Sequence, residues 1–380
     1  MTIRQISVLA LLMVSGFLVV GQFYIAIPLV ADVADRFETS PSNATFVTSA
    51  FGFAYAAGLL LFATLPDRHG PRRVIVLGLM TTALATALVG LASSLVPLLV
   101  ARVIQGLAAS TFPPAGLSLM AGELPLRHRL LGVSLMSFAF LGAGPLAQLF
   151  AAQAPGGLTS IMLKVAPLYL LSAVGLWFAA NRSDTPQSPP RATQRTQLAL
   201  LLRDRGMLAA WAAAATVLLG FVFFHTAAQA VSADIAVDAQ KLRLIGLPPL
   251  LLTFAAAPLS ARLGAPFTAR LGLLLTAFSL VLGAAGTSTS FILATVLLSS
   301  GIAFAIPGLI TIVAGRSPDA NRGQALAFYT FALFFGASIA PPITLWLTQT
   351  GGNLFWVFPG TVLVLAAFGL TVTQKLKTSV

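Results

Sequence analysis

Long apolar stretches alternate with short polar segments along the whole chain. Many of these stretches approach the roughly 20 residues that an α-helix needs to cross a bilayer. They are rich in Leu, Ala and Phe and lack the ten-residue alternating segments of a membrane β-barrel. The pattern predicts an all-α membrane protein with twelve transmembrane helices in 380 residues. The helices whose two ends can both be placed cover roughly residues 6–30, 74–91, 97–120, 160–180 and 207–230.

Composition agrees with a membrane location. Hydrophobic residues make up 57% of the chain and charged residues only 8%, and the mean hydropathy is +0.93. A soluble domain of this composition would expose apolar surface and aggregate. The net charge of +12 is spread over many loops without a basic stripe. It therefore indicates membrane topology and attraction to anionic lipid headgroups, and it predicts no binding of nucleic acid.

The sequence offers no arrangement of catalytic or metal-binding residues. The absence of cysteine excludes disulfides, thiol catalysis and thiolate metal sites. No glycine-rich phosphate loop, no metal-spaced set of His, Asp and Glu, and no Ser-His-Asp arrangement is recognisable. We therefore expect no enzymatic activity, no cofactor and no bound metal.

The charged segment 65–73 sets the expected orientation. It reads Leu-Pro-Asp-Arg-His-Gly-Pro-Arg-Arg, a composition that cannot lie in hydrocarbon, so we expect a short loop. Short loops rich in arginine and lysine stay on the cytoplasmic side. The predicted outer segments hold only Arg36, Lys164, Lys241 and Arg243, and the predicted inner segments hold most of the other basic residues. This bias predicts a multi-pass protein of the cell (inner) membrane with both termini in the cytoplasm.

The chain is predicted to consist of two bundles. Residues 181–206 contain five arginines and a stretch rich in Pro and Ser, which indicates a cytoplasmic linker between bundles 1–180 and 207–380. The Arg68-x-Gly70 pattern of the charged segment recurs as Arg262-x-Gly264, 194 positions later (262 − 68), close to half of the chain. A repeat at this distance predicts two pseudo-symmetric six-helix bundles.

Two segments resemble motifs of the major facilitator superfamily, and in particular of its twelve-helix proton-coupled exporters of drugs and sugars. The segment Asp67-Arg68-His69-Gly70-Pro71-Arg72-Arg73 looks like the superfamily's signature after helix 2, with Ala63 where the family has glycine. The segment Arg102-Val-Ile-Gln105-Gly106-Leu-Ala-Ala looks like the helix-4 motif of the exporter branch. The twelve-helix layout extends the resemblance over nearly the whole chain.

The fifth predicted helix matches the antiporter motif only in part. It keeps Gly142 and the pair Gly144-Pro145 but has Phe140 and Gln148-Leu149 where glycines are usual. The departure bears on the drug-antiport function and leaves the expected fold unchanged.

The resemblance implies an inner gate. It would place Asp67 against the start of helix 11, near residues 321–323, with Glu123 in the same charge cluster. Such a lock would hold the halves together and break when they rock. The loop arginines are also explained by topology alone. The residues expected to act in gating are Asp67, Arg68, Gly70, Arg72, Arg73 and Glu123.

Arg102 and His225 are the most informative residues inside predicted helices. A central arginine costs about 2.5–3.5 kcal/mol to insert, so Arg102 either snorkels to the outer interface or faces a cavity beside Gln105. His225 either forms a hydrogen bond across helices or titrates near physiological pH. The expected substrate or proton pathway comprises Gln22, Tyr24, Arg102, Gln105, Gly106, Gly144, Pro145, His225, Gln229, Phe331 and Phe335.

The usual carboxylate proton carrier is not evident. Asp32 and Asp35 lie at the outer end of the first predicted helix, where a solvated helix end explains them. No Asp or Glu lies deep in a predicted helix, so the residue that couples transport to protons stays open.

The predicted function is secondary active transport by alternating access, with efflux of a small organic solute or drug in exchange for protons. One alternative is an uptake or facilitated-diffusion transporter of a small metabolite, and another is a non-transporting membrane receptor. The expected partners are a small-molecule substrate, protons and the lipid bilayer, and the protein is expected to be a monomer.

Overall fold

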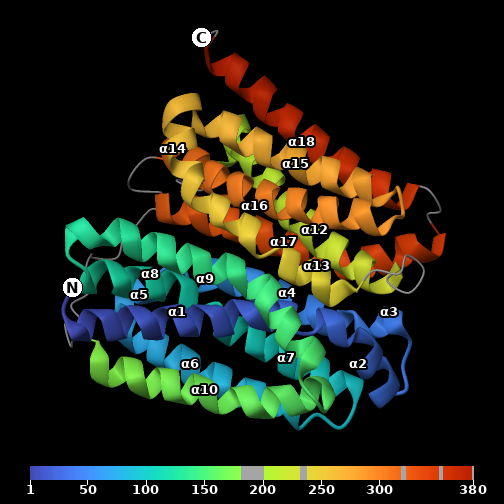
Figure 1. The fold of residues 1–380 in the computed structure, drawn as a ribbon. Helices are drawn as coiled ribbons and strands as arrows, with labels where there is room; N and C mark the ends of the chain where they lie inside the picture. Colours follow the sequence, from blue (N-terminus) through green and yellow to red (C-terminus); the bar gives the residue numbers. More distant parts are fainter. Residues whose placement is uncertain (181–200, 232–237, 318–321, 351–353, 379–380) are drawn as a thin grey trace. The chain divides into compact units, whose positions relative to one another are not determined.

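The computed structural model describes residues 1–180, 201–231, 238–317, 322–350 and 354–378, and these are helical nearly throughout (Figure 1). No strand occurs among them. The chain divides into two compact units, Met1–Ala192 and Thr193–Val380, called unit 1 and unit 2 below and described separately. Residues 181–200 of the expected linker lie outside the described residues, so the expected bundle boundaries stay a prediction.

The described helices suit a bilayer. Ten helical segments are long and apolar enough to cross a membrane, and shorter apolar helices occur at Phe138–Gln153 and Phe355–Thr371. Large apolar side chains are also strongly exposed: Leu61, Leu171 and Phe178 by 67%, 66% and 81%. Such a surface is a liability in water and is suited to lipid contact. The predicted all-α membrane fold is confirmed, while the number of twelve spans stays a prediction.

In unit 1, α1 packs against α8, α9 and α10, and α6 packs against α7 and α10 (Figure 1). The capping box of Thr2 and Gln5 starts the first helix, and Pro41 and Pro71 occupy first-turn positions where their missing N–H is harmless. The elements of unit 1 are α1 (Ile3–Tyr24), η1 (Ile27–Leu29), α2 (Val30–Arg36), α3 (Pro41–Ala44), α4 (Phe46–Leu61), α5 (Leu65–His69), α6 (Pro71–Gly90), α7 (Leu95–Ala109), α8 (Phe112–Glu123), α9 (Leu126–Gln153) and α10 (Gly157–Ala179).

Two helices that the sequence predicts as continuous are broken, both near prolines. The expected helix 6–30 stops at Tyr24, and a 3-10 turn containing Pro28 separates α1 from α2. The expected helix 97–120 is divided into α7 and α8, and Pro113 and Pro114 stand in the first turn of the second piece. A proline removes one backbone donor and clashes with the preceding turn, which explains both breaks.

In unit 2, α12 packs against α16, α17 and α18, and α15 packs against α16 and α18 (Figure 1). The expected eighth helix is interrupted by a 3-10 turn that begins at Pro248. The elements of unit 2 are α12 (Arg205–Val231), α13 (Ala239–Ile245), η2 (Pro248–Leu252), α14 (Thr253–Leu263), α15 (Ala265–Gly283), α16 (Ser288–Arg316), α17 (Arg322–Thr350) and α18 (Leu354–Thr378).

The two Arg-x-Gly patterns have the same backbone conformation. Gly70 has φ 82° and ψ 135°, and Gly264 has φ 88° and ψ 145°. Glycine adopts such positive φ values without a steric penalty. Each glycine directly precedes a helix with a proline in its first turn, which supports the predicted internal repeat. The expected short loop at 65–73 contains a short helix, because Leu65–His69 form α5 and only Gly70 separates it from α6.

Candidate functional site: buried polar clusters

Arg102 lies at the centre of a buried polar cluster in unit 1. Its side chain is completely enclosed, with 0% exposure. Nε donates to the carbonyl of Val47 at 3.0 Å, Nη2 donates to the carbonyl of Gln22 at 2.8 Å, and Nη1 donates to Oε1 of Gln105 at 2.6 Å. The guanidinium carbon also lies 4.4 Å from the ring centroid of Phe51, a cation–π distance. Snorkelling to an interface is therefore excluded as the conformation of Arg102 in this structure.

Gln105 contacts side chains from three other helices, and two of these helices, α6 and α10, are not reached by the hydrogen bonds of Arg102. Its Nε2 donates to Oγ1 of Thr86 on α6 at 2.7 Å and to Oε1 of Gln22 on α1 at 3.2 Å. The sulfur of Met162 on α10 lies 3.8 Å from the same nitrogen. Together with the Arg102 contacts, these bonds join α1, α4, α6, α7 and α10 through groups that are costly to bury unpaired. We call Gln22, Thr86, Arg102 and Gln105 the Arg102 cluster.

The backbone of α1 supplies one of the acceptors. Helix α1 ends at Tyr24, two residues after Gln22, so the carbonyl of Gln22 is among the last four of the helix and lacks an intrahelical donor. The break near Pro28 thus leaves an oxygen that Arg102 uses. Helices α7 and α4 also pack closely at Gly106, where a Cβ would collide with the backbone of Phe51 and with Ala54.

The Arg102 cluster keeps a positive charge among neutral partners. Its acceptors are two carbonyls and an amide oxygen, which stabilise the cation without neutralising it. Neither the ion pair of Arg4 and Glu123 nor that of Arg316 and Asp204 involves Arg102. The cluster can therefore act through its hydrogen bonds and through a field that disfavours a second cation nearby.

The sequence predicted part of this cluster. The structure brings Gln22, Arg102, Gln105 and Gly106 together, while their role in a pathway stays a prediction. Thr86 and Phe51 were missed, because a threonine or a phenylalanine in an apolar run gives no signal of its own. Tyr169 was also missed; it is buried and donates to the carbonyl of Leu18 at 2.7 Å. The predicted Tyr24 is buried against the ring of Phe23.

A second polar group lies in unit 2, where α12 meets α13. Arg243 is 1% exposed and its Nη2 donates to Oε1 of Gln229 at 2.7 Å. Arg243, which the sequence analysis assigns to an outer segment, lies in α13 and is buried, and its side of the membrane stays a prediction. His225, one turn before Gln229, is buried between the rings of Phe221 and Phe224, at centroid distances of 4.5 and 5.7 Å.

Aromatic side chains near His225 form a larger group within unit 2. Phe224 packs against Phe291 and Trp356, and Phe223 packs against Phe355 and Trp356. These rings are buried and form part of the core of unit 2. The predicted pathway residues Phe331 and Phe335 lie on α17, with their ring centroids 5.7 Å from each other.

The remaining predicted pathway pair lies within α9. Gly144 and Pro145 are both buried in the middle of this helix, where the proline removes one intrahelical hydrogen bond. No hydrogen bond found among the described residues connects them to the Arg102 cluster, so their place in a pathway stays a prediction.

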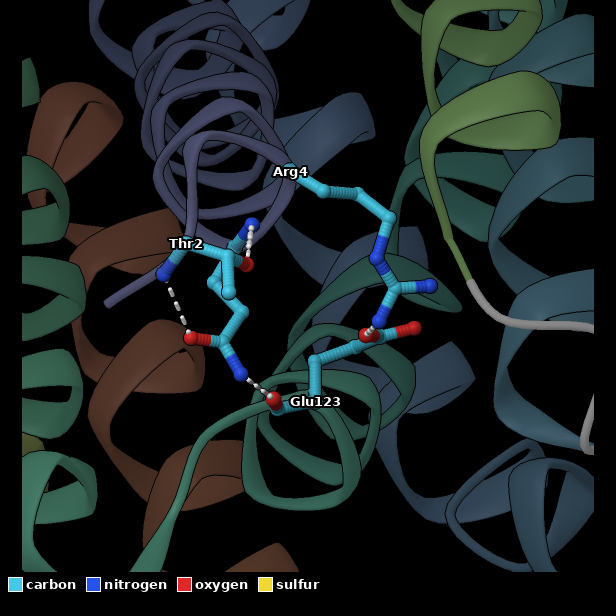
Figure 2. Close-up of polar contacts among 4 residues, drawn as sticks. Thr2, Arg4 and Glu123 are labelled. Atoms are coloured by element: carbon cyan, nitrogen blue, oxygen red, sulfur yellow. Dashed lines mark hydrogen bonds and ion pairs between the residues drawn. The ribbon is translucent and has the colours of Figure 1, made fainter.

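Glu123 is paired with the start of α1. Its carboxylate accepts from Nη2 of Arg4 at 3.1 Å, and its backbone carbonyl accepts from Nε2 of Gln5 at 3.1 Å (Figure 2). The side chain of Glu123 is 2% exposed, whereas that of Arg4 is 44% exposed. The capping turn of Thr2 therefore holds the last residue of α8, a contact that the sequence did not predict.

The arginines of the charged segment have different surroundings. Arg68 and Arg73 are exposed, whereas Arg72 is buried, donates to the carbonyl of Trp177 on α10, and lies with its guanidinium carbon 4.1 Å from the indole centroid. Arg72 thus anchors α6 to α10 within unit 1. The side chain of Asp67 and residue 321 lie outside the described residues, so the gating role stays a prediction.

Asp204 forms an ion pair at the start of α12. Its carboxylate accepts from Nη2 of Arg316 at 2.7 Å and from Nε at 3.1 Å, and it also caps the helix through the backbone N–H groups of Gly206 and Met207. Partial burial raises the pKa of Asp204, but the hydrogen bonds and charge of Arg316 and the capping N–H groups outweigh it, so the net pKa lies below the ordinary value.

Asp32 has a structural partner. Its carboxylate accepts from the backbone N–H of Leu158 at 3.2 Å and so lies at the N-terminus of α10, where a negative charge is favoured. Gly157 beside it has φ +66°, and a Cβ there would collide with the carboxylate. The expectation of a merely solvated helix end is therefore wrong for Asp32.

No group of three or more His, Asp and Glu side chains that could hold a metal occurs among the residues that the structure describes. The geometry instead defines a multi-pass helical membrane protein whose buried polar groups lie between helices. The model of the Major Facilitator Superfamily matches residues 12–240 and 242–378. The chain belongs to the Major Facilitator Superfamily of transporters.

Curated relatives agree with this assignment. The chain is 31% identical over 208 residues to Multidrug resistance protein D of Escherichia coli (strain K12), covering 51% of this chain and 49% of the relative. It is 32% identical over 187 residues to the putative uncharacterized transporter YgaY of the same strain, covering 45% and 44%. It is 32% identical over 93 residues to the Methylenomycin A resistance protein of Bacillus subtilis (strain 168), covering 24% and 20%. The matches thus span half or less of these relatives' length.

Proposed function

We propose that this transporter exports a small organic solute in exchange for protons by alternating access. The observation that carries the proposal is the Arg102 cluster, a buried cation held by neutral groups from several helices of unit 1. Intramembrane charges are expensive to bury and mark substrate or ion pathways. Relatives named for drug resistance support export as the direction.

We also propose that His225 of unit 2 and Arg102 of unit 1 take part in coupling transport to protons. Histidine is the side chain whose ordinary pKa lies nearest to physiological pH. His225 is buried and makes ring contacts with Phe221 and Phe224 but no hydrogen bond among the described residues. A ring that is not committed to a structural hydrogen bond is free to exchange a proton when the site is hydrated.

We propose that both termini and residues 181–206 are cytoplasmic and that the protein lies in the cell (inner) membrane as a monomer. The support is the excess of arginine and lysine in the segments assigned to the inner side. A reporter fused after Arg191 tests the orientation, because it would be active as a cytoplasmic reporter. Export of the reporter would contradict the orientation.

The transport function is tested by flux in proteoliposomes that contain the purified chain. The panel would include lipophilic cations, organic anions, sugars and amino acids, each with and without an imposed pH gradient. Gradient-driven movement of at least one solute against its own gradient is the expected result. Solute equilibration that ignores the pH gradient would indicate facilitated diffusion, and the absence of flux for the whole panel would favour a non-transporting role.

A further inference from the structure

The distribution of charge inside the helices bears on the kind of solute that the protein accepts. All ten acidic residues fall outside three long stretches of sequence that are free of Asp and Glu, namely 68–122, 124–183 and 239–318. The helices around the Arg102 cluster, α6, α7 and α10, lie within the first two stretches. The helices that contact the Arg102 cluster therefore hold a buried cation and no carboxylate that could offset it.

The acids of unit 1 that the structure describes lie at helix ends. Asp32 caps α10, Glu123 is the last residue of α8, and Asp35 and Glu38 are exposed in α2 and just after it. A carboxylate at such a position is separated from Arg102, which takes only neutral acceptors among the described residues. A cationic solute would therefore find no carboxylate within these helices and would be repelled by Arg102.

Arg102 also has hydrogen-bonding capacity that its described partners do not use. Guanidinium carries five N–H donors, and three of them are engaged in the described part of the chain, one each at Nε, Nη1 and Nη2. Its Nη1 partner, Gln105, is a neutral amide that an anionic oxygen could replace as acceptor. Guanidinium and carboxylate form shorter and stronger hydrogen bonds than neutral pairs do.

We infer that the transported solute carries a negative charge, most simply a carboxylate on an apolar body, and that Arg102 determines this selectivity. The inference rests on the proposed transport function and names the solute class for the same site. An anion compensates the buried charge of Arg102, whereas an amine adds a second positive charge in a low-dielectric interior. The apolar helices around the cluster suit the body of such a solute.

The test uses matched ligands that differ only in charge. The full chain in nanodiscs of neutral lipid would be titrated at pH 7 with 3-phenylpropionate, 3-phenylpropanamide and 3-phenylpropylamine, and with the carboxylate, amide and amine of a naphthyl analogue. Ligand-induced thermal stabilisation would give the apparent Kd of each. The expected order is carboxylate, then amide, then amine, with a difference of about tenfold or more between carboxylate and amine, which corresponds to about 1.4 kcal/mol.

Two variants connect the preference to Arg102. Arg102→Gln removes the charge, and Gln105→Glu keeps Arg102 but places a carboxylate beside it, so the result does not depend on one variant folding. Each is expected to reduce the preference for the carboxylate to about twofold or less. Arg262→Gln, which removes an exposed arginine of α14, is the matched control and should keep the full preference.

Three results would overturn the inference. These are binding of the amines as tight as that of the carboxylates, failure of every carboxylate to bind, and an unchanged carboxylate preference in Arg102→Gln and Gln105→Glu. A failure of the transport function is distinguishable, because carboxylate-selective binding without flux in proteoliposomes would support the selectivity of Arg102 and contradict transport.

Discussion

Arg4 and Glu123 form an ion pair of 3.1 Å that joins the first turn of α1 to the last residue of α8 (Figure 2). The residues are 119 positions apart in sequence. The neighbouring Gln5 strengthens the connection by donating to the backbone carbonyl of Glu123. Helix α8 is separated from α7 by a break near Pro113, and the contact with α1 fixes the C-terminal end of α8.

Removing this contact should loosen unit 1. We expect Arg4→Gln to lower the free energy of unfolding by about 1 kcal/mol, because it leaves the enclosed carboxylate of Glu123 with less compensation. Gln5→Ala should have a smaller effect, since the hydrogen bonds that it removes, to the carbonyl of Glu123 and from the N–H of Thr2, are both between neutral groups. Thermal unfolding followed by tryptophan fluorescence measures both, with Lys164→Gln on an exposed side chain as the control. Equal melting temperatures for Arg4→Gln and the control would show that the ion pair is not stabilising.

The ion pair of Asp204 and Arg316 should make stability depend on pH at the acid end. The pKa of Asp204 is lowered in the folded protein, so its contribution is fully present above the unfolded value of about 3.9 and is lost as the pH falls through the folded pKa. Asp204→Asn keeps a capping oxygen but loses the ion pair. We expect it to be less stable than the wild type at pH 7 by about 0.5–1 kcal/mol.

Chemical unfolding of wild type and Asp204→Asn between pH 7 and pH 3 measures this effect. The two proteins should begin to converge in stability below about pH 4, where the unfolded wild type starts to bind the proton, and converge further as the pH falls toward the lowered pKa of the folded protein. Arg316→Gln should behave like Asp204→Asn, since it removes the other partner. A stability difference that stays constant down to pH 3 would contradict the assignment.

Asp67 is predicted to act in the conformational step. Asp67→Asn should slow transport severalfold while solute binding and protein level stay close to those of the wild type, because the change affects gating and leaves the binding site intact. Transport rate and apparent Kd measured on the same preparation separate the two effects. A wild-type rate for Asp67→Asn would remove Asp67 from the gate.

His225 is predicted to couple transport to protons. His225→Gln keeps a polar side chain of similar size but cannot titrate, so pH-driven transport should be abolished while solute exchange at equal pH continues. Measuring both pH-driven transport and solute exchange at equal pH on His225→Gln separates the two activities. Intact pH dependence would exclude His225 and direct attention to Asp35, because Asp32 is engaged at the N-terminus of α10.

The sequence predicts the membrane fold well because its main signals are local. Apolar runs of spanning length and basic loops depend on composition over about 20 residues, and the positive φ of Gly70 and Gly264 follows from a local Arg-x-Gly pattern. The helix breaks near Pro28 and Pro113 were also encoded locally. They were missed because a proline in an apolar run can be tolerated within a membrane helix.

The site was predictable only where a residue type is unusual in hydrocarbon. Arg102, Gln105 and Gln22 are conspicuous in apolar surroundings, and the structure brings them together. Thr86 gives no such signal, since its role depends on the distance to Gln105 on another helix. The burial of Arg243 was not predicted, because it depends on Gln229, which accepts its hydrogen bond and lies on another helix.

The account depends most on Arg102. Replacing it with alanine would leave the carbonyls of Gln22 and Val47 and the amide of Gln105 without their cationic donor, in a site that is closed to water. We therefore expect Arg102→Ala to impair both gradient-driven transport and exchange without a gradient, each by tenfold or more, about 1.4 kcal/mol in the barrier. Arg102→Lys should retain part of the activity, because it keeps the charge but cannot form all three hydrogen bonds.

The most direct measurement is solute flux into proteoliposomes containing wild type or Arg102→Ala, with an imposed pH gradient and at equal pH. The wild type should accumulate solute only when the gradient is present, and Arg102→Ala should neither accumulate solute nor exchange it at a comparable rate. Accumulation by Arg102→Ala at the wild-type rate, in protein of unchanged melting temperature, would contradict the central role of the Arg102 cluster.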